Sequence, residues 1–102
     1  MKHVMNINEI TINIKYYGVI GALSGAKQEV IQIPENSTLK DLLEELTKTK
    51  NAAFKERLFK NNEIESDIII LINNVDYRLL QDLDTPLKNN DTVTIISVVH
   101  GG

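Results

Sequence analysis

The fold is decided by Ile33-Pro34-Glu35-Asn36-Ser37-Thr38-Leu39-Lys40-Asp41-Leu42-Leu43-Glu44-Glu45-Leu46, in which a strand ends and a long helix begins. Pro34 closes the strand, and Thr38 with Asp41 three residues later forms a capping box. The leucines recur at i, i+3, i+4 and i+7, which predicts one apolar stripe along the helix. The two neighbouring glutamates fall on the opposite side, so we interpret them as a solvated surface and not as a catalytic pair.

The segment before this helix predicts a hairpin. Isoleucines and a tyrosine alternate with polar residues from Ile10 to Tyr17, which is the period of a half-buried strand whose even positions point inward. Tyr17 then points outward. Three glycines follow within eight residues and predict a turn, after which Gln28 to Ile33 returns as a second strand with Ile31 and Ile33 on its apolar face.

The segment after the long helix predicts a short helix and then a strand. Phe54 and Leu58 lie one turn apart within the range Ala52 to Lys60, which we interpret as a helical lid on the edge of the core. Ile68 to Ile72 is apolar throughout and reads as a third strand. The Asn73-Asn74 pair after it suits a tight turn, because asparagine tolerates positive φ.

The last strand is predicted from Thr92 to Val98, after a loop that contains four leucines and Pro86. Val93, Ile95 and Ser97 share its inward face, so Ile96 and Val98 lie outward. The element order is that of an α+β ubiquitin-like β-grasp, a mixed sheet of four to five strands packed on one long helix plus a short helix. The connections satisfy the usual handedness rules if the first and last strands are parallel neighbours in the sheet centre, and we expect that arrangement.

Composition limits the classes of function. The 102 residues support one domain, and the absence of cysteine excludes disulfides and thiolate chemistry. A net charge of -3 with interspersed signs argues against nucleic-acid binding. No signal peptide is recognisable, and the longest apolar run is too short to span a membrane, so we expect a cytoplasmic protein. Metal-ligand spacings, a phosphate loop and a serine triad are missing, which indicates that the chain is not an enzyme.

The sequence ends with Gly101 and Gly102, and we expect residues 98–102 to form a flexible tail. Glycine fits a crevice too narrow for other residues, so the tail can enter a partner's active site and deliver its carboxylate. That carboxylate needs activation, most simply by ATP, before a sulfur or amine nucleophile attacks it. The alternative is a frayed terminus without a role. His100 lacks an orienting partner, so we expect it to be recognised by the partner and not to act as a base.

Several segments resemble the MoaD/ThiS family of ubiquitin-like sulfur carriers. The first of these segments is the stretch from Ile33 to Leu46. The others are Ile72-Asn73-Asn74, the segment from Leu83 to Asp91 with its Asp-Thr-Pro-Leu element, and the terminal Gly-Gly. The His-Gly-Gly ending is also similar to that of ubiquitin-related modifiers, and small archaeal modifier proteins share the plan. The resemblance covers the chain from Ile10 onward. It implies a domain at 10–97 with an N-terminal extension at 1–9 that has no counterpart.

The resemblance implies that an activating enzyme adenylates Gly102 and that a sulfur donor converts the product to a thiocarboxylate. It also implies a docking patch for that enzyme, formed by Tyr17, Leu80, Ile96 and Val98. Two departures are visible. Asn90 replaces a turn glycine, which its tolerance of left-handed backbone permits. Ser97 and Val98 replace a pair of prolines found in some molybdopterin-synthase small subunits, which weighs against a role in molybdenum-cofactor synthesis.

Three hypotheses remain open. The first is a sulfur carrier that donates sulfur for molybdopterin biosynthesis or tRNA thiolation, with a molybdopterin synthase large subunit or a tRNA thiolase as acceptor. The second is a modifier whose Gly102 is joined to lysines of target proteins. The third is a small subunit that inserts its tail into a partner enzyme. In all three the chain binds no cofactor, and ATP is used by the activating enzyme.

Overall fold

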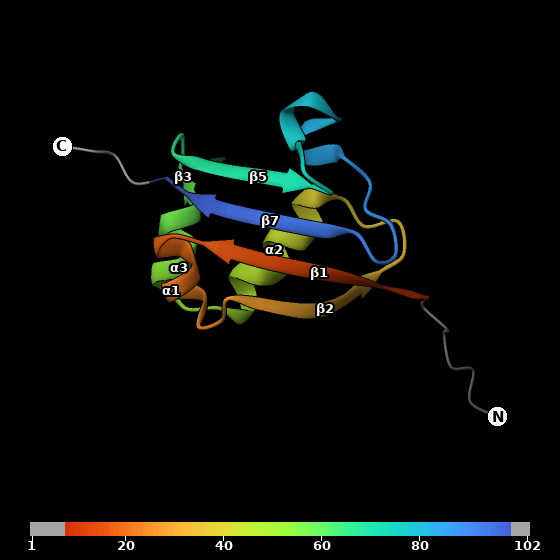
Figure 1. Cartoon of the computed structure of the whole chain (residues 1–102), viewed down its shortest axis with the longest axis horizontal. Helices are drawn as coiled ribbons and strands as arrows, with labels where there is room; N and C mark the ends of the chain where they lie inside the picture. The colour runs from red at the N-terminus through yellow and green to blue at the C-terminus, as the bar shows by residue number, and fades with distance from the viewer. Residues whose placement is uncertain (1–7, 99–102) are drawn as a thin grey trace.

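The computed structural model describes residues 8–98 and shows a five-stranded mixed sheet with the order β2-β1-β7-β5-β6. The long helix α2 crosses one face of this sheet (Figure 1). β1 and β2 are antiparallel, whereas β1 and β7 are parallel neighbours, as the sequence predicted. The five strands are β1 (Glu9–Tyr17), β2 (Gln28–Pro34), β5 (Ile68–Ile72), β6 (Val75–Asp76) and β7 (Thr92–Ser97).

The sheet starts one residue before the predicted domain boundary. Glu9 pairs with Pro34, and the carbonyl of Asn8 accepts a 2.8 Å hydrogen bond from the Glu35 amide. Glu9 therefore belongs to β1 and not to an extension, because its backbone is part of the ladder. The rest of the predicted extension, residues 1–7, lies outside the described residues.

The helix α2 (Leu39–Thr49) is built as its sequence predicted. The Thr38 hydroxyl accepts a hydrogen bond from the Asp41 amide at 3.3 Å, and the Asp41 carboxylate accepts one from the Thr38 amide at 2.9 Å. This reciprocal pair satisfies two backbone donors that the helix itself leaves unpaired. All four predicted stripe residues are buried, namely Leu39, Leu42, Leu43 and Leu46.

The connection between β1 and β2 is a helix where the sequence predicted only a turn. This helix, α1, spans Val19–Ser24. Gly18 precedes it with φ 82° and Gly25 follows it with φ 81°, so two of the three glycines flank the helix instead of forming a simple turn. Ile20 in its first turn is fully buried. The hairpin pairing itself is confirmed.

The second predicted helix is shorter than expected. The helix α3 spans Ala52–Leu58, and the next two residues form β3 (Phe59–Lys60), which pairs with β4 (Glu63–Ile64). Two asparagines with positive φ make the turn between these strands. Phe54 and Leu58 are 0% exposed, so α3 contributes to the centre of the core and is not a lid on its edge.

The remaining loops carry two 3-10 helices, η1 (Tyr77–Leu79) and η2 (Asp82–Asp84). The predicted asparagine turns are confirmed, with φ values of 50° at Asn73, 70° at Asn74 and 70° at Asn90. None of the helices within residues 8–98 combines the length and the apolar character needed to cross a membrane.

One polar cluster joins three elements around the buried Tyr16 ring. The Tyr16 hydroxyl donates a 2.6 Å hydrogen bond to the Glu29 carboxylate, and the Lys50 ammonium group lies 2.7 Å from the same carboxylate. The pKa of Tyr16 is raised well above its usual value, mainly by burial and to a smaller extent by the hydrogen bond to Glu29. The cluster therefore ties β1 and β2 to the C-terminal end of α2.

Candidate functional site

The site predicted from the sequence lies where the chain leaves β7, and we call Ser97 and Val98 the tail exit. β7 is paired on both sides, with β1 and with β5, so its last residues have little freedom to move (Figure 1). The Val98 amide continues the pairing by donating a 2.9 Å hydrogen bond to the Asp67 carbonyl. The predicted carrier residues Gly101 and Gly102, and His100 before them, lie outside the described residues.

The first support of the tail exit is a contact between β7 and α1. The Ser97 hydroxyl accepts a 3.0 Å hydrogen bond from the Ile20 amide, and it lies 3.4 Å from the Tyr17 carbonyl. A Cβ atom at Gly18 would lie only 2.4 Å from the Ser97 carbonyl oxygen, so only glycine fits there. Ser97 thus caps a helix that is 77 residues distant in the sequence.

The second support comes from α3. Both terminal guanidinium nitrogens of Arg57 donate 2.8 Å hydrogen bonds to the two carboxylate oxygens of Asp67. This hydrogen bonding raises the pKa of Arg57 and is the bidentate geometry that fixes a carboxylate most firmly. Since the Asp67 carbonyl holds Val98, the ion pair also fixes the direction in which the chain leaves the sheet. Neither support was predicted from the sequence.

The predicted docking patch is assembled in part by the sheet. Tyr17 and Ile96 are neighbours in the β1–β7 ladder, and Tyr17 is 54% exposed. Ile96 is half-buried, and Val98 is 39% exposed two residues further along the same strand direction. Leu80 is 44% exposed but follows η1, beyond the edge strand β6. The sheet therefore brings three of the four residues to the tail exit.

The prediction missed Ile69, which pairs with Ile96 from the other side of β7 and is half-buried. The signal was hidden because every residue of β5 is apolar, so the sequence of that strand has no alternation to separate its two faces. The row Tyr17, Ile96 and Ile69 is thus the apolar row that the sheet itself defines next to the tail exit.

Comparison with known proteins identifies the family. The family model Urm1 (Ubiquitin related modifier) matches residues 11–102 of this chain. The chain belongs to the Urm1 family. A ubiquitin-related modifier 1 homolog of Caenorhabditis elegans is 32% identical over 100 residues, which are 94% of this chain and 100% of that protein.

Solved structures place the Urm1 family chain among ubiquitin-like β-grasp proteins. Small archaeal modifier protein 1 of Methanosarcina acetivorans superposes with a TM-score of 0.77 at 25% identity, covering 93% of this chain and 99% of that one. A putative molybdopterin converting factor subunit 1 of Pyrococcus furiosus gives 0.69 at 29% identity, covering 88% and 99%. These findings confirm the predicted fold class and the resemblance to ubiquitin-like sulfur carriers and modifiers.

Proposed function

We propose that this Urm1 family chain is a ubiquitin-like sulfur carrier that acts through the carboxylate of Gly102, with tRNA thiolation as its destination. The observation that carries the proposal is the family match, which runs through the Gly-Gly ending. The fold supports it physically. β7 is paired on both sides up to Ile96, and the bond to Asp67 holds Val98, so the last four residues start from a fixed point and can be presented to a partner.

The chemistry takes place in the partner's active site. A carboxylate oxygen of Gly102 attacks the α-phosphorus of ATP, and pyrophosphate leaves, which gives an acyl-adenylate. A persulfide sulfur on a donor protein then attacks the acyl carbon, and AMP leaves. Reductive cleavage of the sulfur–sulfur bond by a thiol gives the thiocarboxylate, which passes its sulfur to the thiolating enzyme. The chain is a substrate in each step, needs no bound cofactor of its own, and works in the cytoplasm.

The second candidate function is protein modification. It is favoured by the family description and by the likeness to an archaeal modifier protein. Here a lysine amine of a target protein attacks the activated Gly102 and leaves an isopeptide bond. The activation step is common to both functions, so only the nucleophile differs. Molybdopterin biosynthesis, suggested by the Pyrococcus furiosus neighbour, is the third destination.

The docking patch of Tyr17, Leu80, Ile96 and Val98 is part of the proposal, as the surface that the activating enzyme contacts. Three of these residues, Tyr17, Ile96 and Val98, lie together at the tail exit, and apolar residues clustered next to a reactive tail are typical of an interface anchor. An Ile96→Glu variant should be adenylated more slowly while its melting temperature stays close to that of the wild type. Val75→Glu, at an exposed apolar residue outside the patch, is the control. Equal adenylation of both variants would remove the patch from the proposal.

The decisive experiment is mass spectrometry of the protein and its adducts recovered from its own cells. Exchange of a terminal oxygen for sulfur on the free protein supports the sulfur carrier. A branched remnant of the tail on lysines of other proteins supports the modifier. The controls are a variant without Gly101 and Gly102 and a variant with one alanine added after Gly102. Absence of both signals in the wild-type protein would refute both functions.

A further inference from the structure

We propose that the outer edge of β2 and the acidic groove beside it bind an extended segment of a partner protein in which basic residues alternate with apolar ones. This surface is independent of the proposed function. The groove lies at the opposite end of the sheet from the tail exit, because Pro34 pairs with Glu9 at the start of β1, whereas Tyr17 at the end of β1 pairs with Ile96. The outer edge of β2 is separated from β7 by β1.

The first observation is a strand edge that no other strand within residues 8–98 covers. β2 stands at the end of the sheet order, and hydrogen bonds from Tyr16 to Lys27 and from Glu35 to Asn8 bracket its ladder with β1. In antiparallel pairing these bonded positions recur at every second residue. The odd-numbered residues of β2 therefore face β1, and the backbone groups of Gln28, Val30 and Gln32 point outward from the sheet.

The second observation is that this edge lacks the usual protection up to its last residue, Pro34. Proteins commonly block a free edge with lysine, proline or a bulge, or keep it very short. The six residues from Gln28 to Ile33 contain neither lysine nor proline, and Val30 among them is 63% exposed. The opposite edge strand β6 has only two residues. β2 is thus the strand edge on which another chain can pair.

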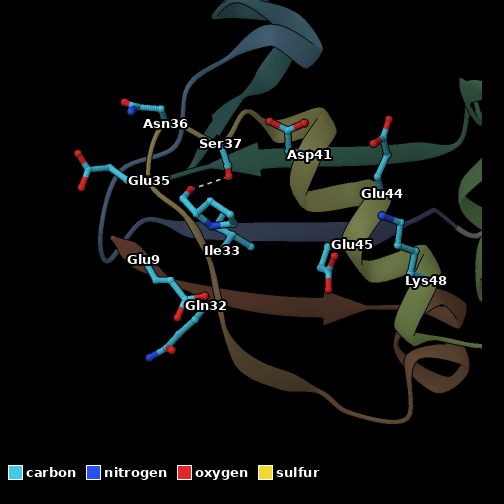
Figure 2. Close-up of a pocket in the computed structure, with 11 residues that line it drawn as sticks. Glu9, Gln32, Ile33, Glu35, Asn36, Ser37, Asp41, Glu44, Glu45 and Lys48 are labelled. Atoms are coloured by element: carbon cyan, nitrogen blue, oxygen red, sulfur yellow. Dashed lines mark hydrogen bonds between the residues drawn. The ribbon is translucent and has the colours of Figure 1, made fainter. Parts of the chain in front are cut away.

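The third observation is the groove of about 510 Å³ between the end of β2 and α2 (Figure 2). Five carboxylates line it against one ammonium group, that of Lys48. Figure 2 shows these carboxylates on α2 and on the strand side of the groove; on α2, Glu45 points toward the strands, whereas Asp41 and Glu44 point away from them. The five carboxylates belong to Glu9, Glu35, Asp41, Glu44 and Glu45.

These observations together select the occupant. A strand added to β2 presents every second side chain, about 6.6 Å apart, to the face on which α2 lies. Lysine or arginine at those positions meets the carboxylates of the groove, and apolar residues at the others lie on the face of Val30. A second copy of this chain is a poorer fit, because residues 28–34, which would form the added strand, contain no lysine or arginine to meet the carboxylates of the groove.

The test uses the full chain and a fluorescent heptapeptide, Thr-Lys-Val-Lys-Val-Lys-Thr. We expect saturable binding by anisotropy that weakens with added salt, and NMR shifts centred on the amides of Gln28, Val30 and Gln32. Two control peptides separate the contributions. One has glutamate in place of lysine, and the other has N-methylated backbone amides, which keep the charge but remove the donors for strand pairing. Neither control should bind.

Protein variants test the same two contributions. Glu44→Gln combined with Glu45→Gln should weaken binding about three- to tenfold, as expected for two exposed ion pairs. The matched control combines Glu56→Gln with Glu63→Gln, two exposed carboxylates outside the groove. Val30→Pro removes an outward N–H that makes no ladder bond and should abolish binding. If that variant does not fold, the N-methylated peptide still decides the backbone contribution.

Three results would overturn the proposal. The first is equal binding of either control peptide, or shifts confined to the docking patch. The second is concentration-dependent dimerisation that shifts the β2 amides without peptide. The third is tighter peptide binding after removal of residues 1–7, which contain Lys2 and His3. That result would assign the edge to the chain's own N-terminal segment.

Discussion

Gly18 is the residue at which one added methyl group tests how the tail exit is built. Its backbone, with φ 82° and ψ -157°, lies in a region that is essentially restricted to glycine and that costs other residues about 1–3 kcal/mol. The alanine Cβ would also lie 2.4 Å from the Ser97 carbonyl oxygen and 2.6 Å from its hydroxyl. Ser97 cannot retreat easily, because β7 is bonded on both sides.

We therefore expect Gly18→Ala to lower the free energy of unfolding by about 4 kcal/mol, since overpacking adds about 1–3 kcal/mol to the backbone strain. For a chain of this length that corresponds to a fall in melting temperature of about 20 °C. Urea denaturation followed by circular dichroism measures the first quantity, and a thermal melt measures the second.

Two other glycines provide matched controls in the same segment. Gly25 has φ 81°, but a Cβ there would meet nothing within 4 Å, so Gly25→Ala should cost only the left-handed backbone penalty of about 1–2 kcal/mol. Gly21 lies within α1, and a Cβ added there would lie 3.4 Å from the Tyr16 Cβ, so Gly21→Ala should be close to neutral. If Gly18→Ala were no more destabilising than Gly25→Ala, the close approach to Ser97 would be refuted.

Three further substitutions test the polar contacts. Ser97→Ala should cost about 1–3 kcal/mol in urea denaturation, because it leaves a buried N–H of α1 unpaired; no loss would contradict this cap. Because the pKa of Tyr16 is raised in the folded chain, the unfolded chain releases the Tyr16 hydroxyl proton above pH 10 while the folded chain keeps it. The free energy of unfolding of the wild type should therefore fall above pH 10, and that of Tyr16→Phe should fall less. Parallel profiles of the two proteins would exclude Tyr16 as the cause. Hydrogen bonds from Arg78 lower the pKa of Asp76 to about 2, so this carboxylate stabilises the fold above pH 3.8 and loses that effect as the pH falls toward 2. Asp76→Asn should therefore make the free energy of unfolding depend less on pH between pH 3.8 and 2. An unchanged pH dependence would contradict this role of Asp76.

The elements that the sequence predicted are those specified by local signals. The leucine stripe and the capping box fixed α2, and the asparagine pairs fixed two turns, because each signal lies within a few residues of the structure it specifies. α1 was missed because it has six residues and no side-chain cap of its own. Its cap comes from Ser97 in β7, and such a contact is invisible until the sheet has been assembled.

In the candidate site, too, the predicted parts follow from local sequence patterns and the missed parts from contacts between distant segments. Tyr17 and Ile96 were placed on the outer face by alternation, and their adjacency then followed from parallel pairing of the first and last strands. The Arg57–Asp67 pair and the free edge of β2 depend on which elements become spatial neighbours. No local pattern in a single sequence encodes these contacts.

The central position of β7 has a mechanical consequence. A pull on the C-terminus runs along the strand and loads the β1 and β5 ladders in shear, so many hydrogen bonds share the force at once. A force applied perpendicular to an edge strand would instead break its hydrogen bonds one after another. Under the proposed function, a partner that draws the C-terminal residues into its active site would therefore load the domain in the direction in which its hydrogen bonds resist best.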